Sequence, residues 1–194
     1  MGRKREFDYE RALKRATRLF WASGYMGASM RHLLKAMGIR ESSFYHLFGS
    51  KKRLYLECLK HYNEDVTRRR LATLEAEPPV RKGIRNFFRG LLNELDDPRT
   101  PRVCLMSRSL SSDVLDEAEL RSYVKAGMAH FEESFVARLN AAKKSGELPP
   151  DYPAEAAAQI IFTYLQGFFR VVHVLKNRDE MWRQIDTLLT SLGL

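Results

Sequence analysis

The sequence lacks the features that mark several large classes of protein. It contains only two cysteines, Cys58 and Cys104, and so has neither a disulfide framework nor a zinc spacing. No apolar run reaches the length of a membrane helix, and the charged N-terminus has no apolar core of a secretory signal. These absences favour a cytoplasmic protein with two buried free thiols. A redox-sensing thiol is the alternative.

Motifs of catalysis and metal binding are also missing. There is no phosphate-binding loop, no Gly-x-Ser-x-Gly elbow, no His-Glu-x-x-His motif and no Glu-x-x-His pair. The five histidines are scattered without the spacing of metal ligands. We therefore expect no catalytic residues, no metal and no cofactor, and we do not expect an enzyme.

Positive charge is present in excess but is unevenly distributed. The formal net charge is +9 at pH 7. Residues 1–60 hold 14 Lys and Arg against 5 Asp and Glu, whereas residues 61–194 hold 19 of each kind. A basic segment attracts polyanions and releases counterions from DNA, so this distribution favours a DNA-binding N-terminal part. A solvated basic face without a partner is the weaker alternative.

Residues 24–54 show the pattern of two short helices joined by a tight turn. Ser29 is a good N-cap, because its hydroxyl can accept a hydrogen bond from an unpaired backbone N–H. Apolar side chains then recur at helical spacing until Gly38, which ends the helix because glycine adopts a left-handed backbone without a Cβ clash. We therefore expect the first helix over residues 30–37.

The second short helix is expected to run from about Arg40 or Glu41 to Phe48. Three apolar side chains, Phe44, Leu47 and Phe48, are expected to share its inner face. The remaining side chains are small, polar or aromatic and should point outward. This composition is typical of the second helix of a helix-turn-helix, which enters the major groove of DNA.

The same stretch resembles the tetracycline-repressor-like (TetR) family of bacterial regulators. The resemblance rests on Ser29-Met30-Arg31, on Gly38-Ile39 and on the run FYHLFGSKKRL from Phe44 to Leu54, and it covers roughly residues 8–55. Four positions depart from the residues that are usual in the family: His32, Leu34, Arg40 and Ser42. The resemblance implies a DNA-binding domain over residues 1–53 and an effector-binding and dimerisation domain over residues 54–194.

Roles at the DNA follow from the positions that match the family. Arg31 is the best candidate for a guanine contact, because a guanidinium can donate two parallel hydrogen bonds. Lys51 begins the next helix and suits a phosphate, where helix amides and a cation act together. The expected DNA contacts are Ser29, Arg31, Glu41, Ser42, Ser43, Tyr45, His46 and Lys51.

The rest of the chain carries helical periodicity and no strand signal, so we expect an all-α fold of about nine helices. A basic arm at residues 2–6 should precede the first of them. Outside the motif, helices are expected over residues 8–23, 50–77, 80–96, 102–112, 114–145, 154–176 and 179–192.

Aromatic and methionine residues gather between positions 84 and 135 and again near 164–168. They either pack a core or line the cavity of a small, largely apolar effector, for which methionine is well suited. The TetR resemblance favours the cavity, since members of that family commonly hold a ligand among these helices. Its expected walls are Phe87, Phe88, Leu91, Cys104, Met106, Met128, Phe131, Phe135, Tyr164 and Phe168.

The last two helices carry more apolar surface than one core contact uses. This surface belongs either to a buried central helix or to a dimer interface. Specific regulators usually bind two half-sites about one helical turn (~34–36 Å) apart, which favours a homodimer. The family also dimerises there, and the expected interface residues are Ile161, Leu165, Phe169, Trp182, Ile185, Leu188 and Leu189.

The resemblance therefore implies a ligand-responsive transcriptional regulator, most often a repressor, that binds a palindromic operator in double-stranded DNA as a homodimer. A small, largely apolar effector should release it, and its place should be the cytoplasm, in association with the nucleoid. Two alternatives from other classes are a sequence-tolerant DNA-binding protein and an all-α ligand carrier or enzyme with a vestigial DNA-binding head.

Overall fold

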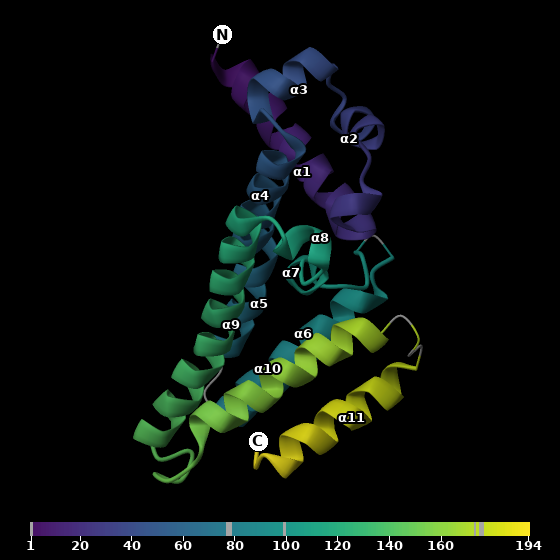
Figure 1. The fold of residues 1–194 in the computed structure, drawn as a ribbon. Coiled ribbons are helices and arrows are strands. Elements are labelled where there is room, and N and C mark those ends of the chain that lie inside the picture. Colours follow the sequence, from purple (N-terminus) through teal and green to yellow (C-terminus); the bar gives the residue numbers. More distant parts are fainter. Residues whose placement is uncertain (1, 77–78, 99, 173, 175–176) are drawn as a thin grey trace. The chain divides into compact units, whose positions relative to one another are not determined.

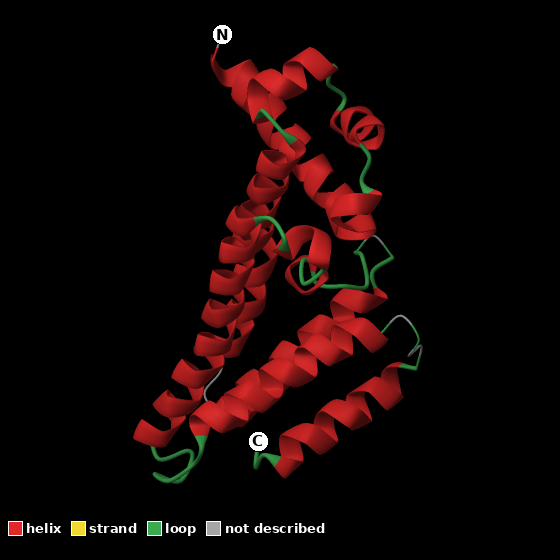
Figure 2. Cartoon of the chain, in the orientation of Figure 1, coloured by secondary structure: helices red, strands yellow, loops and turns green. Residues whose placement is uncertain are grey.

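The computed structural model describes residues 2–76, 79–98, 100–172, 174 and 177–194, with side chains from residue 9 onward. Every regular element in these residues is helical, as Figure 2 shows. The expected all-α class is therefore confirmed. The described residues form eleven α-helices and one π-helical turn, close to the expected number.

The chain divides into two compact units. Unit 1 contains residues 1–66 and 103–127, and unit 2 contains residues 67–102 and 128–194. The sequence predicted a single boundary at 53/54, whereas the contacts bring a segment of the second half into unit 1. The chain passes between the units within helical segments at Val66–Thr67 and Gly127–Met128, and in a loop at Arg102–Val103.

Unit 1 is built around a long first helix that bends near its end (Figure 1). Its elements are α1 (Gly2–Gly27), α2 (Met30–Met37), α3 (Glu41–Phe48), α4 (Lys51–Tyr62), η1 (Asn63–Thr67, whose last residue lies in unit 2), α7 (Leu105–Arg108), α8 (Ser112–Leu115) and the start of α9 (Ala118–Lys144). The backbone bends at Gly24, where φ is 76° and ψ is 177°. Helix α1 begins at Gly2, so it includes residues 2–6, which were expected to form an arm. In place of the single helix expected over residues 102–112, the chain forms the two short helices α7 and α8.

The segment 103–127 is an integral part of the core of unit 1. The indole N–H of Trp21 donates to the carbonyl of Val103. The hydroxyls of Tyr55 and Ser109 lie 2.7 Å apart in a buried hydrogen bond. Burial raises the pKa of Tyr55 to about 12. The ring of Phe20 packs edge-on against Tyr55 at 4.8 Å, so α1, α4 and α7 meet at one aromatic residue.

The helix expected over residues 50–77 is interrupted by the π-helical turn η1. The amide of Asn63, the first residue of η1, donates to the hydroxyl of Tyr123 in α9 at 3.0 Å. A Cβ atom on Gly127, one turn further along α9, would lie 2.6 Å from Met106 Cε. Glycine therefore leaves room for the Met106 side chain against α9 beside the turn. A π-turn holds one residue more than an α-helical turn, and periodicity alone does not reveal it.

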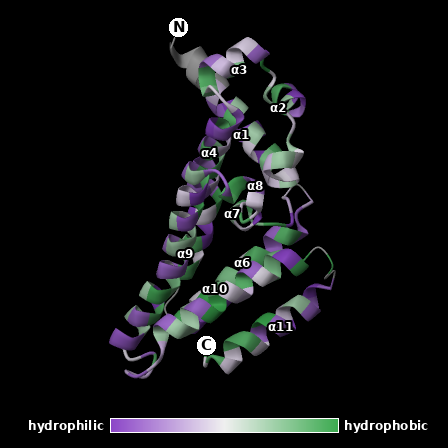
Figure 3. Ribbon diagram, in the orientation of Figure 1, coloured by the Kyte–Doolittle hydropathy of each residue, from purple (hydrophilic) through white to green (hydrophobic). Residues whose placement is uncertain are grey.

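Unit 2 consists of amphipathic helices, which alternate between apolar and polar colours in Figure 3. They are α5 (Arg68–Glu75), α6 (Val80–Asp96), the later part of α9, α10 (Ala154–Val171) and α11 (Arg178–Ser191). Helix α10 was expected to continue to residue 176, but it ends at Val171, and residues 173, 175 and 176 lie outside the described part. Asn177 caps α11, since its side-chain oxygen accepts from the N–H of Asp179 at 2.9 Å.

The core of unit 2 contains aromatic rings and the buried guanidinium of one ion pair. Phe87 packs edge-on against Phe135 at 5.2 Å between ring centroids. The guanidinium of Arg70 is buried, donates to the carboxylate of Glu94 at 2.6 Å and lies over the ring of Phe169 at 5.7 Å. This pair joins α5 to α6, and breaking it would leave an uncompensated buried charge.

Candidate nucleic-acid interface

The turn between α2 and α3 has the geometry that the sequence predicted. Ser29 Oγ accepts a hydrogen bond from the backbone N–H of His32 at 3.2 Å. Gly38 has a left-handed backbone, with φ 71° and ψ 32°, and its N–H donates to the carbonyl of Leu34 at 2.9 Å. A side chain at this φ would be strained, so the tight turn depends on glycine.

The inner face of α3 is narrower than expected. Phe44 and Phe48 are buried, and the ring of Tyr9 from α1 stacks on Phe48 at 5.3 Å. Leu47 was expected to be buried beside them, but 37% of its surface is exposed. It points about 80° away from the centre of the Phe44–Phe48 face, because successive helical residues are about 100° apart. The two phenylalanines therefore anchor α3, and Leu47 lies at the edge of its outer surface.

The outer face of α3 presents the residues that were expected to read DNA. All of the predicted contacts on this helix are exposed: Glu41, Ser42, Ser43, Tyr45 and His46. The ring of Tyr45 is held edge-on against Phe44, with centroids 5.2 Å apart. The phase of the helix is thus as predicted, whereas the contact of each side chain with DNA remains a prediction.

Two lysines occupy the first turn of α4. Ser50 caps this helix, since its Oγ accepts from the N–H of Arg53 at 3.1 Å. The ammonium of Lys51 lies over the ring of Tyr25, 4.7 Å from the centroid, and burial lowers the pKa of this lysine. The ammonium of Lys52 forms an ion pair with Glu117 at 3.2 Å. Cations and unpaired amides therefore meet at one helix N-terminus, which suits an anion.

Arg31 was predicted to contact a base. It is exposed on α2 and forms no ion pair with the described part of the chain, as a base-reading residue requires.

Two residues that contact the lysines of α4 were not predicted from the sequence. Tyr25 was not recognised as the support of Lys51, although it follows the glycine that bends α1. Glu117 carried no signal at all, because it lies 65 residues beyond the lysine that it contacts.

The residues expected to line an effector cavity fall into both units. Cys104 and Met106 belong to unit 1. In unit 2, buried Phe87, Phe88, Leu91, Phe135 and Phe168 lie among partly exposed Met128, Phe131 and Tyr164. Ring contacts connect the six aromatic members of this set in unit 2. These contacts are those of a packed core, so the lining role remains a prediction.

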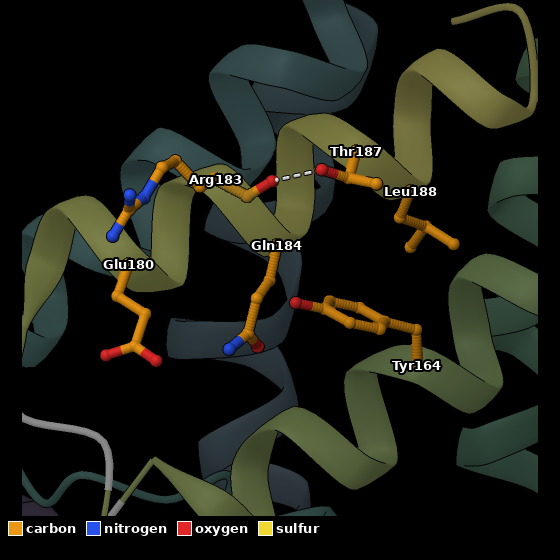
Figure 4. Close-up of a pocket in the computed structure, with 6 residues that line it drawn as sticks. All are labelled: Tyr164, Glu180, Arg183, Gln184, Thr187 and Leu188. Carbon is orange, nitrogen blue, oxygen red and sulfur yellow. Dashed lines mark hydrogen bonds between the residues drawn. The ribbon is translucent and has the colours of Figure 1, made fainter.

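A pocket of about 600 Å³ lies between α10 and α11 in unit 2. It is lined by Tyr164, Glu180, Arg183, Gln184, Thr187 and Leu188, of which the sequence had assigned only Tyr164 to a cavity. Figure 4 shows the hydroxyl of Tyr164 pointing toward the Gln184 side chain, whereas Arg183 extends away. The Tyr164 hydroxyl is buried and has no hydrogen-bond partner in the described part of the chain.

Most of the residues expected at a dimer interface are buried within the single chain. Ile161, Leu165, Ile185 and Leu189 are fully buried, and Phe169 is 5% exposed. Only Trp182 and Leu188 are partly exposed. The five buried side chains pack α10 and α11 into unit 2, so they are not available to a second copy. The exposed apolar residues nearby on α10 are instead Ile160 and Val171.

No described helix has both the length and the apolar character needed to cross a membrane. Nor do the described His, Cys, Asp and Glu side chains gather into a group of three that could hold a metal ion.

Fold and site together define a DNA-binding protein of the helix-turn-helix class. The family model "Bacterial regulatory proteins, tetR family" matches residues 12–58. The chain is 31% identical to the uncharacterized HTH-type transcriptional regulator YezE of Bacillus subtilis (strain 168) over 193 residues, covering 99% of this chain and all of the relative. The chain therefore belongs to the tetR family of transcriptional regulators, and it is not an enzyme.

Two further similarities extend over most of the chain. The HTH-type transcriptional repressor ComR of Escherichia coli (strain K12) is 26% identical and covers 86% of this chain and 80% of the relative. A solved structure of the TetR-family regulator CifR, a cysteine mutant in complex with 26-base-pair operator DNA, matches with a TM-score of 0.87 and 28% identity. That match covers 93% of this chain and 94% of the other.

Proposed function

We propose that this regulator binds a palindromic operator as a homodimer, represses transcription there, and is released by a small, largely apolar effector. The observation that carries the proposal is the exposed outer face of α3 beside the lysine-bearing N-terminus of α4, both in unit 1. The names of the relatives support it, since ComR is called a repressor and CifR was solved with operator DNA. The place of action would be the cytoplasm, at the nucleoid.

The proposed roles divide the DNA contacts into two kinds. Residues 1–53 would form the DNA-binding domain and residues 54–194 the effector-binding and dimerisation domain. Arg31 would donate to a guanine edge, and Ser29 and Lys51 would contact phosphates. On α3, Glu41, Ser42 and Ser43 would face the major groove. Tyr45 and His46 would contact phosphates or the edge of the groove.

Two alanine variants test this division. Lys51→Ala should weaken binding to operator and random DNA alike and lower the slope of log affinity against log salt by about 1. Arg31→Ala should cost roughly 1–3 kcal/mol on the operator and relax the preference at one base pair. Lys14→Ala, which removes an exposed charge from α1, serves as the control. An equal loss on every sequence for Arg31→Ala would refute its assignment to a base.

The dimer interface would lie over the pocket between α10 and α11. The position of the pocket supports this, because it lies at the surface formed by the last two helices and is lined by Leu188, one of the residues expected at the interface. The partly exposed Trp182 and Leu188, with Ile160 and Val171 on α10, would supply apolar contact area. A two-fold axis through this surface would place the same pocket on both sides of the interface.

The effector would bind among the aromatic residues of unit 2. Its binding would change the distance between the DNA-binding domains of the two protomers. Linkage requires that operator DNA weaken effector binding by the same factor by which effector weakens DNA binding. A thermal-shift screen of metabolites would identify a ligand, which is then titrated with and without operator. Equal affinities in the two titrations would exclude that ligand as the inducing signal.

A further inference from the structure

An acidic segment of unit 1 lies against the basic N-terminus of α4. Residues 112–119, which form α8 and the beginning of α9, contain four carboxylates and no lysine or arginine. The four are Asp113, Asp116, Glu117 and Glu119. In sequence they are far from the motif, but the segment 103–127 folds into the same unit as α2, α3 and α4.

Two of these carboxylates act on the two lysines. Glu117 Oε2 lies 3.2 Å from Lys52 Nζ, and the two side chains are 44% and 40% exposed. The charge of Asp113 acts on Lys51, where it opposes the effect of burial on the pKa of that ammonium. Both carboxylates therefore lie where they lower the positive potential that a DNA phosphate would meet at this helix N-terminus.

A carboxylate and a phosphate compete for the same cation. An ammonium that is already paired releases fewer counterions when it meets DNA, so it contributes less to affinity and to its salt dependence. The Lys52–Glu117 pair is nearly half exposed, and such pairs contribute little to folding stability. It can therefore be opened at small cost to the fold.

We infer that residues 112–119 restrain DNA binding, with Glu117 acting as the positioning residue that holds Lys52 away from phosphate. The inference rests on the proposed function, since it needs Lys52 to face DNA. It also gives that function a physical route of regulation. The chain enters the segment 103–127 from unit 2 at Arg102–Val103 and returns at Gly127–Met128. A change in unit 2 that displaces either end would alter the Lys52–Glu117 pair.

The test uses the full-length protein and a fluorescent duplex of random sequence, so no operator is needed. Binding is measured by anisotropy at several salt concentrations. Glu117→Gln should tighten binding about two- to fivefold at low salt, the range of a surface ion pair, and should steepen the salt slope. Asp116→Asn is the matched control, because it removes the same charge from an exposed neighbour that forms no ion pair in the described residues.

The same substitution in a Lys52→Gln protein distinguishes the Lys52–Glu117 ion pair from long-range repulsion between the Glu117 carboxylate and DNA. In a Lys52→Gln protein, the change Glu117→Gln should have no further effect on affinity or slope. The inference is overturned if Glu117→Gln weakens binding, leaves it unchanged, matches Asp116→Asn, or acts equally on the Lys52→Gln background. Failure of the wild-type protein to bind any duplex DNA would instead refute the proposed function.

Discussion

Two substitutions three residues apart on α11 should separate the core of unit 2 from the dimer interface. Ile185 is fully buried, whereas Leu188 is partly exposed and lines the pocket beside Tyr164. Ile185→Glu removes about 1.5–3 kcal/mol of apolar burial. It also buries a carboxyl group, which costs roughly 2–7 kcal/mol even when protonated and without a partner. Their sum approaches a typical total stability of about 5–15 kcal/mol, so this variant should be largely unfolded.

Leu188→Glu should behave differently. In the single chain the new carboxylate remains hydrated, and the cost to folding should be close to the ±0.5 kcal/mol that is typical of surface changes. In the dimer it would be unpaired against an apolar surface, and each 1.4 kcal/mol of that penalty weakens association about tenfold. We therefore expect a folded monomer.

Sedimentation velocity and circular dichroism together distinguish these outcomes. Thr190→Glu adds the same charge to an exposed position of α11 outside the pocket, so it should remain a folded dimer. A Leu188→Glu protein that remains a dimer would refute the pocket as the interface. A folded Ile185→Glu protein would refute the assignment of that face of α11 to the core.

Three further predictions concern unit 1. Burial raises the pKa of Cys58 to about 12, so iodoacetamide at neutral pH should label the half-buried Cys104 well before Cys58, and equal labelling by mass spectrometry would contradict this. The pKa of Tyr55 is raised from 10.0 to about 12, so its contribution to stability is complete below pH 10 and is lost as pH rises toward 12. Tyr55→Phe should therefore show a smaller alkaline loss in denaturant titrations than the wild type, and an unchanged loss would refute the assignment. Deleting Glu64 from η1 should remove the extra residue of the π-turn and leave a regular, folded α-helix. Deleting Lys125 from the regular helix α9 should instead unfold unit 1. Equal thermal midpoints of the two deletion variants would refute the π-turn.

Local chemistry made the helix-turn-helix predictable from sequence. The cap at Ser29, the left-handed Gly38 and the inner face of Phe44 and Phe48 each depend on residues within one or two turns. The exposed phase of α3 follows from the same spacing. Leu47 was misplaced because periodicity cannot tell how wide the buried face is. The ring of Tyr9 from α1 covers this face at Phe48, whereas Leu47 stays exposed.

Features set by distant contacts were not predictable in this way. The segment 103–127 joins unit 1 through partners tens of residues away, such as Trp21 with Val103 and Tyr55 with Ser109. The apolar excess of α10 and α11 indicated two contact surfaces but not which residues serve each. The structure assigns Ile185 to the core, and the extra residue of η1 is visible only in the backbone.

The central claim is that this chain reads a defined DNA sequence as a homodimer. Its most direct test is selection of binding sites from a random DNA pool with the purified protein, followed by footprinting of the enriched site. We expect two inverted half-sites, with centres about 10–10.5 base pairs or a multiple of that apart, each occupied by one protomer. Enrichment of no sequence, with equal affinity for random DNA, would contradict the claim.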